Sequence, residues 1–72
     1  LQAESLVAAR ALLMHAIETA RSRGYERLSL ETGAQPAFVP AHTLYRSAGF
    51  VECGPFEGYG PDANSVFMTL RL

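Results

Sequence analysis

The sequence has one cysteine, Cys53, among its 72 residues, and this scarcity excludes a framework of disulfide bonds. A metal site would have to combine Cys53 with the two histidines, His15 and His42. Their spacing matches no zinc-binding pattern, so the sequence predicts no metal. A reducing, cytoplasmic setting is the default expectation for a chain with one unpaired cysteine.

Charge is also scarce. Lysine is absent, the six basic residues are arginines scattered along the chain, and the formal net charge is −1. Nucleic-acid-binding proteins gather basic residues into a patch, so the sequence predicts no nucleic-acid partner. No hydrophobic run approaches the ~20 residues that cross a bilayer, and no signal-peptide pattern opens the sequence. We therefore expect no membrane association.

Hydrophobic residues, in contrast, make up 49% of the chain. A chain of 72 residues holds one domain at most, and a domain this small buries only about 60% of the surface that its unfolded chain exposes. We expect more apolar surface than one small core can hide, and hence either a partner or a missing neighbouring segment.

Hydrophobic spacing predicts a helix from about Ser5 to Arg23. Ser5 is the expected N-cap, and Gly24 is the expected residue just past the C-terminus. The residues that recur at helical spacing and would form one apolar stripe are Leu6, Ala9, Leu13, Ala16, Ile17 and Ala20.

Three short segments alternate like strands. In "RLSLET", residues 27–32, Leu28 and Leu30 point to one face and Glu31 to the other. "FVECGPF", residues 50–56, is a brief strand that stops at its glycine and proline. "SVFMTLRL", residues 65–72, closes the chain as a strand, with Phe67 on one face. Its other face would carry Val66, Met68, Leu70 and Leu72.

Between the first two strands, "GAQPAFVP" is predicted to be a connection, and a second, short helix follows from about Pro40 to Ala48. Proline suits the first helical position, and Gly49 ends the helix. The element order is therefore α-β-α-β-β. The last two strands, joined by a loop, are expected to pair antiparallel.

The ordered set of these motifs resembles the C-terminal half of the GCN5-related N-acetyltransferase (GNAT) family. The most specific motif is "LYRSAGF", which fits the family's LY-x-x-x-GF pattern at Leu44, Tyr45, Gly49 and Phe50. The resemblance runs from about Ala8 to the end of the chain. It implies an α/β (α+β) fold, half of an acyl-CoA N-acyltransferase fold, with two helices and a three-stranded mixed sheet whose last strand lies between the first and the second.

A domain of this family is about twice as long as the chain. The resemblance therefore implies that residues 1–72 are a single partial domain whose N-terminal half would precede Leu1. It further implies transfer of an acetyl group from acetyl-CoA to a primary amine by direct attack, in a complete domain or an assembled oligomer. Tyr45 matches the family tyrosine that protonates the leaving thiolate, a general-acid role. The alternative is a buried aromatic residue whose hydroxyl is hydrogen-bonded.

The resemblance also places the coenzyme. The family lays the pyrophosphate of acetyl-CoA against the start of the long helix, which implies binding at Val7, Ala8, Ala9 and Arg10. The family pattern Q/R-x-x-G-x-G/A falls on Glu4, Val7 and Ala9, and only Ala9 fits it. Val7 is β-branched where a glycine is expected, and Glu4 adds a negative charge near the phosphates. The alternative is a capped helix start with no ligand.

Other polar residues allow two interpretations each. Glu31 is a base for the amine or a solvent-facing strand carboxylate, and His42 takes part in proton traffic or lies on the surface. Cys53 is expected to be a small buried apolar residue rather than a nucleophile. The loop with Tyr59 and Asp62 contacts the substrate or is a plain hairpin connection.

Without the N-terminal half of the domain, the first strand would be an open edge of the sheet, which predicts self-association. Open backbone groups on an edge strand pair readily with a second copy, so we expect a homodimer that joins these strands across a two-fold axis. This expectation supports an alternative function for the chain. In that interpretation it is a truncated, non-catalytic GNAT-like module that persists as an oligomer or a partner-binding domain.

Overall fold

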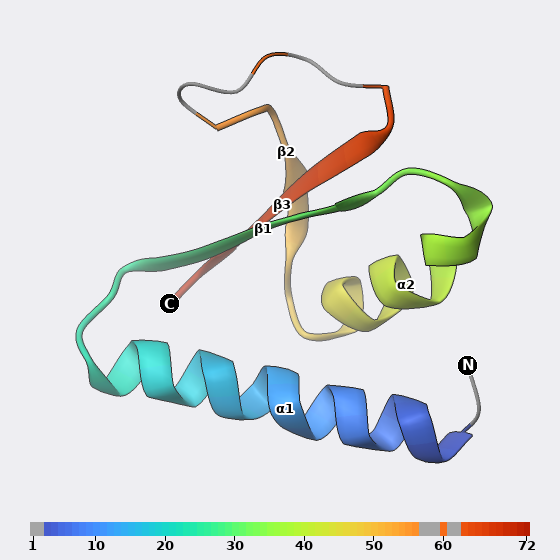
Figure 1. Cartoon of the computed structure of the whole chain (residues 1–72). Coiled ribbons are helices and arrows are strands. Elements are labelled where there is room, and N and C mark those ends of the chain that lie inside the picture. The colour runs from blue at the N-terminus through green and yellow to red at the C-terminus, as the bar shows by residue number, and fades with distance from the viewer. Residues whose placement is uncertain (1–2, 57–59, 61–62) are drawn as a thin grey trace.

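Two helices and a three-stranded sheet form the structure, which confirms the predicted α/β class (Figure 1). The computed structural model describes residues 3–56, 60 and 63–72, with side chains from residue 6 onward. The elements are α1 (Ala3–Ser22), β1 (Arg27–Gly33), the 3₁₀ helix η1 (Pro36–Phe38), α2 (Val39–Ser47), β2 (Val51–Cys53) and β3 (Ser65–Arg71). Apart from η1, this is the predicted order.

Helix α1 ends where the sequence predicts and begins earlier. Gly24 has a φ of +81°, and the N–H of Tyr25 donates to the carbonyl of Ala20 at 3.1 Å, which closes the helix as predicted. The helix begins at Ala3, so Ser5 lies inside it and the prediction of Ser5 as N-cap is wrong. Alanine and glutamate are good helix formers, and they extend α1 beyond the apolar stripe.

The sheet has the strand order β1-β3-β2, so the last strand lies between the other two as predicted. Both ladders are antiparallel, and Leu30 of β1 lies opposite Met68 of β3. The prediction that the sheet would be mixed therefore needs correction. β1 and β2 do run parallel to each other, but β3 separates them, so neither described ladder is parallel.

The segment before α2 is more regular than predicted. Residues 36–38 form η1, with the N–H of Phe38 bonded to the carbonyl of Gln35 at 2.9 Å, and the chain continues directly into α2 at Val39. A proline at the start of such a turn presets its φ angle. The prediction for the end of α2 is confirmed, because Gly49 has a φ of +105° and stops the helix.

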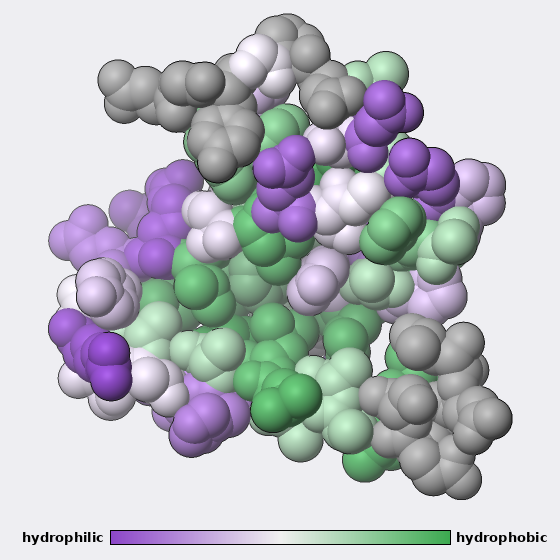
Figure 2. Space-filling model, viewed as in Figure 1, coloured by the Kyte–Doolittle hydropathy of each residue, from purple (hydrophilic) through white to green (hydrophobic). Residues whose placement is uncertain are grey.

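The core lies between the helices and one face of the sheet. Ile17 of α1, Phe50 and Met68 are fully buried, at 2%, 2% and 0% exposure. The predicted apolar face of the strands packs against them through Leu28, Leu30, Val66, Leu70 and Leu72. Hydrophobic residues also reach the surface in the middle of the molecule, between α1 and the strands (Figure 2). The core is small, and the helices do not cover it completely.

The opposite face of the sheet is more polar but holds one buried aromatic residue. Phe67 is 4% exposed, and the ring of Phe56 packs edge-on against it at 5.0 Å between centroids. Beside it, the hydroxyls of Ser29 and Thr69 hydrogen-bond across the strands at 2.9 Å. Neither helix of the described chain combines the length and the apolar composition needed to cross a bilayer.

His42 ties α2 to the end of β1. It is 8% exposed, so the expectation of a surface histidine is wrong. Its Nε2 donates to the carbonyl oxygen of Gly33 at 2.7 Å, which satisfies a backbone group that β3 does not reach. No local pattern predicts this contact, because it depends on how α2 folds back over the strand.

Replacing His42 with leucine should destabilise the fold by about 1–3 kcal/mol, because the Gly33 carbonyl would lose its buried partner. Urea unfolding followed by circular dichroism measures this loss. The matched control is His15→Leu, since His15 is exposed on α1 and its replacement should change stability by less than about 0.5 kcal/mol. Equal midpoints for the two variants would contradict the role of His42.

Candidate functional site

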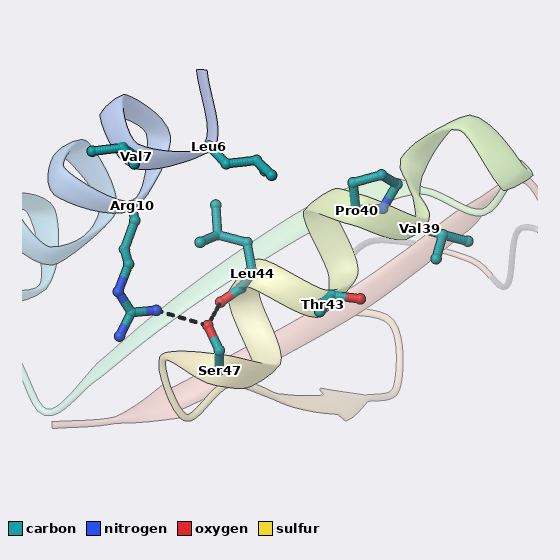
Figure 3. A pocket seen from close by; sticks show the side chains of 8 residues that line it. All are labelled: Leu6, Val7, Arg10, Val39, Pro40, Thr43, Leu44 and Ser47. Atoms are coloured by element: carbon teal, nitrogen blue, oxygen red, sulfur yellow. Dashed lines mark hydrogen bonds between the residues drawn. The ribbon is translucent and has the colours of Figure 1, made fainter. Parts of the chain in front are cut away.

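A hollow of about 560 Å³ lies between the first turns of α1 and one side of α2 (Figure 3). Helix spacing explains its walls. Residues three and four positions apart lie on the same face of a helix, so each helix contributes one row of side chains to the wall of the hollow. The lining residues are Leu6, Val7 and Arg10 of α1, and Val39, Pro40, Thr43, Leu44 and Ser47 of α2.

The walls are almost entirely apolar, and their outer residues are open to solvent. Val7 is 70% exposed and Val39 54%, while Leu44 is half-buried. Exposed aliphatic side chains around a concave surface are typical of a site that covers an apolar part of a ligand. The hollow can therefore receive an organic group between the two helices.

Arg10 is the one charged residue among the described lining residues. Its Nη1 donates to Oγ of Ser47 at 2.9 Å, and that hydroxyl donates to the carbonyl of Leu44 at 2.7 Å, so the guanidinium is held beside the last turn of α2. A guanidinium carries five N–H donors, and this contact uses one of them. The other donors are available to an anion such as a phosphate.

Two of the four predicted coenzyme-binding residues line the hollow. Val7 and Arg10 do, whereas Ala8 is exposed and Ala9 half-buried, both outside the described lining. A helix leaves its first four N–H groups without helical partners. Because α1 begins at Ala3, those groups belong to the turn before Val7, and residues 7–10 can meet a ligand mainly through side chains. The side chain of Glu4 lies outside the described residues.

Tyr45 lies on the other side of α2. It is half-buried, and its ring packs against Phe50 with centroids 5.8 Å apart and planes inclined at 60°. Within the part of the chain that the structure describes, its hydroxyl makes no hydrogen bond, and no buried side-chain oxygen or nitrogen lacks a partner. The hydroxyl is therefore open to solvent and can donate a proton, but Tyr45 does not line the hollow with Arg10.

The remaining candidates are dispersed. Glu31 is exposed, as expected for a strand carboxylate, and accepts a hydrogen bond from the hydroxyl of Ser65 at 2.6 Å. Cys53 is half-buried at the end of β2. Tyr59 and Asp62 lie outside the described residues. Among those described, no three His, Cys, Asp or Glu side chains are placed to hold a metal ion.

Sequence reasoning missed the α2 wall of the hollow. Ser47, which holds Arg10, stands 37 residues away in the chain, and no local pattern links the two. The sequence does contain one sign of this wall: residues 39, 40, 43, 44 and 47 follow helical spacing and so form one stripe, on the side of α2 away from Tyr45. That stripe predicts a second packing face but not what packs on it.

Comparison with known proteins places the sequence in a family. A sequence model of the acetyltransferase (GNAT) family matches residues 8–50, which include Arg10, all of α2 and Tyr45. An uncharacterized N-acetyltransferase of Bacillus subtilis (strain 168), YsnE, is 59% identical over 64 residues, covering 89% of this chain and 42% of that protein. YedL of Escherichia coli (strain K12), also an uncharacterized N-acetyltransferase, is 44% identical over 61 residues, which cover 85% of this chain and 38% of that protein.

A third relative is the IAA acetyltransferase of Azospirillum brasilense. It is 48% identical over 63 residues, which cover 88% of this chain and 40% of that protein. The chain thus spans about two fifths of the length of each of these relatives.

Proposed function

Because the chain belongs to the acetyltransferase (GNAT) family, we propose that residues 1–72 are the carboxy-terminal part of a domain that transfers an acetyl group from acetyl-CoA to a primary amine. One observation carries the proposal: the family match over residues 8–50 includes Arg10, the α2 wall of the hollow and Tyr45. Three relatives named as acetyltransferases, at 44–59% identity, support it.

The chemistry of the hollow fits the coenzyme. Acetyl-CoA supplies an activated thioester on a long carrier whose phosphates are anionic and whose remaining parts are largely apolar or neutral. Arg10 offers a fixed cation, and the aliphatic walls from Leu6, Val7 and Leu44 cover apolar groups. Of the four coenzyme-binding residues that the family resemblance implied, Val7 and Arg10 hold the ligand in this proposal, whereas Ala8 and Ala9 lie outside the lining of the hollow.

The transfer itself is a direct attack. The amine nitrogen forms a bond to the thioester carbonyl carbon, the carbon–sulfur bond breaks, and the nitrogen releases a proton to solvent. In our proposal Tyr45 gives its hydroxyl proton to the departing thiolate and regains one from water. Tyr45 and Arg10 lie on different sides of α2, so the thioester end of the ligand must extend beyond the hollow. We propose that the rest of the domain completes that part of the site.

The Arg10 contact gives a measurable prediction. Coenzyme A should raise the melting temperature of the chain, since a ligand at a hundredfold excess over Kd stabilises the folded state by about 2.7 kcal/mol. Arg10→Gln should remove most of the shift by deleting the cation. Thermal unfolding with coenzyme A, and with adenosine as an uncharged comparison, measures the effect.

Arg23→Gln is the matched control. It deletes the same charge from an exposed arginine just past the end of α1, away from the hollow, and should leave the coenzyme A shift unchanged. An unchanged shift in Arg10→Gln, or equal losses in both variants, would contradict the assignment of the phosphates to Arg10.

A chimera tests acetyl transfer. The matching segment of the Bacillus subtilis relative would be replaced with this chain, and acetyl-CoA consumption would be followed with a panel of primary amines. If the chain is the catalytic part of a domain, the chimera should release coenzyme A in an amine-dependent reaction. A folded chimera without activity, beside an active parent, would overturn the proposal.

The second candidate is a non-catalytic module that persists as a homodimer. It is favoured by Val7, which stands where the family pattern has a glycine. Either function is proposed for the cytoplasm, where the thiol of Cys53 would stay reduced. The inactive chimera described above is the outcome that this candidate predicts.

A further inference from the structure

Arg10 is held in place without being neutralised. Its Nη1 donates to Oγ of Ser47 at 2.9 Å, and Ser47 is an uncharged residue of the other helix (Figure 3). Arg21, further along α1, shows a different arrangement, because it forms an ion pair with Glu18. A carboxylate cancels the charge of a guanidinium, whereas a hydroxyl fixes its position and leaves the charge available to an anion.

The helix that carries Arg10 does not hold its side chain. Ion pairs within a helix join residues three or four positions apart, and for Arg10 those residues are all apolar. They are Leu6, Val7, Leu13 and Met14. Within the part of the chain that the structure describes, the bond to Ser47 is the one polar contact of the Arg10 side chain. Because an exposed arginine otherwise samples many rotamers, Ser47 decides where the guanidinium lies.

The hydroxyl of Ser47 has a fixed direction. It donates its proton to the carbonyl oxygen of Leu44 at 2.7 Å, one turn earlier in α2. A serine hydroxyl has a single proton, so it presents a lone pair to Arg10 and acts there only as an acceptor. The carboxyl end of α2 lies at the same place, and its partial negative charge favours a cation.

The hydrogen bond joins the two walls of the hollow. Arg10 lines it from α1 and Ser47 from α2. A ligand that has to immobilise a free arginine loses about 2–10-fold in affinity to the ordering of that side chain. This loss is avoided where the arginine is already held, and the unused N–H donors of Arg10 are then ready for the anion.

We propose that Ser47 is a positioning residue for coenzyme binding, which holds the charged guanidinium of Arg10 at the α2 wall of the hollow before the ligand arrives. This inference rests on the proposed function, in which Arg10 binds the phosphates of the coenzyme. Ser47 acts through Arg10 and not on the reacting atoms, so it contributes to affinity for the coenzyme and not to the transfer step.

Kinetics of the Bacillus subtilis chimera test this role. Ser47→Ala should raise KM for acetyl-CoA by about 2–10-fold and leave kcat unchanged, since the interaction is the same in the ground state and the transition state. Calorimetric titration with coenzyme A should show the same change in Kd. Ser47→Thr keeps a hydroxyl that can bond to the helix backbone, and it should restore most of the affinity.

A double-mutant cycle separates positioning from a general structural role. In an Arg10→Gln background, Ser47→Ala should change Kd by less than about twofold, because no guanidinium is left to position. Ser22→Ala is the comparison variant. The hydroxyl of Ser22 donates to the carbonyl of Thr19 at 3.0 Å, the same kind of bond at the end of α1, and no arginine of the described chain contacts it. Its loss should leave KM and Kd as they are.

Nitrogen relaxation of the Arg10 Nε–H group gives a readout that needs no ligand. In the chain itself the order parameter of this group should exceed that of Arg23, an exposed arginine just past the end of α1. Ser47→Ala should lower the Arg10 value to that of Arg23. Circular dichroism of the same sample shows that the variant is folded.

The possible failures can be told apart. If Arg10→Gln weakens coenzyme A binding and Ser47→Ala does not, the proposed function stands and the role of Ser47 is overturned. An equal loss from Ser47→Ala with and without Arg10 would also overturn it, because Ser47 would then act independently of the guanidinium. A chimera that does not bind coenzyme A, or whose affinity is unchanged by Arg10→Gln, would overturn the assignment of the phosphates to Arg10 and this inference with it.

Discussion

In the chimera, replacing Tyr45 with phenylalanine is expected to lower kcat by about 10²–10⁴-fold, the usual loss when a general acid is removed. The ring stays in place against Phe50, so only the proton donor disappears. The loss should be largest for acetyl-CoA itself and smaller for thioesters whose thiols are more acidic, since those leave without protonation. Steady-state rates with the two kinds of thioester measure both effects.

The same substitution should leave stability nearly unchanged. Because the Tyr45 hydroxyl makes no hydrogen bond within the described chain, its removal should alter the free energy of unfolding by less than about 0.5 kcal/mol. Tyr25→Phe, at an exposed tyrosine beyond α1, is the matched control and should keep full activity. A Tyr45→Phe chimera as fast as its parent would show that another group protonates the thiolate.

Phe50→Ala is expected to have the largest effect on stability, about 3–5 kcal/mol. Phe50 is 2% exposed and packs with Ile17 and Met68 in the only buried cluster of the described core. A small domain has a total stability near the lower end of about 5–15 kcal/mol, so this loss should leave much of the chain unfolded. Circular dichroism and urea unfolding at room temperature measure it.

The neighbouring residue supplies the comparison. Val51 is 61% exposed, and Val51→Ala removes apolar atoms one position away without opening a cavity in the core. It should cost less than about 1 kcal/mol. If Phe50→Ala unfolded at the same urea concentration as Val51→Ala, the cluster around Met68 would not be what holds the helices to the sheet.

Most of the architecture could be predicted because it depends on local patterns. Alternation predicted that Leu28 and Leu30 share one face of the strand, and in the structure both pack on the core side of the sheet. Gly24 and Gly49 ended both helices as predicted, since each adopts a positive φ that other residues avoid. The strand order β1-β3-β2 came from the family resemblance rather than from spacing.

What could not be predicted depends on contacts between distant segments. The burial of His42 requires α2 to fold back on the end of β1, and the link between Arg10 and Ser47 requires the start of α1 to lie beside the end of α2. No periodicity within either helix encodes such a pairing. The start of α1 was missed for a different reason, because an apolar stripe locates the packed part of a helix and not its first turn.

The candidate site is therefore divided. The family resemblance implied coenzyme binding at residues 7–10 and proton donation by Tyr45, within one site. In the structure Arg10 lies in the hollow and Tyr45 lies across α2 beside Phe50. A ligand that uses both must pass from one side of α2 to the other. This is why we propose that residues outside the chain complete the site.

The most direct test is a titration of the chain with coenzyme A, followed by amide chemical shifts. Our proposal predicts concentration-dependent shifts at residues 6–10 of α1 and 43–47 of α2, which fade in Arg10→Gln and persist in Arg23→Gln. Absence of shifts at millimolar coenzyme A, or shifts confined to the strands, would contradict the claim that these two helices form the coenzyme-binding side of an acetyltransferase domain.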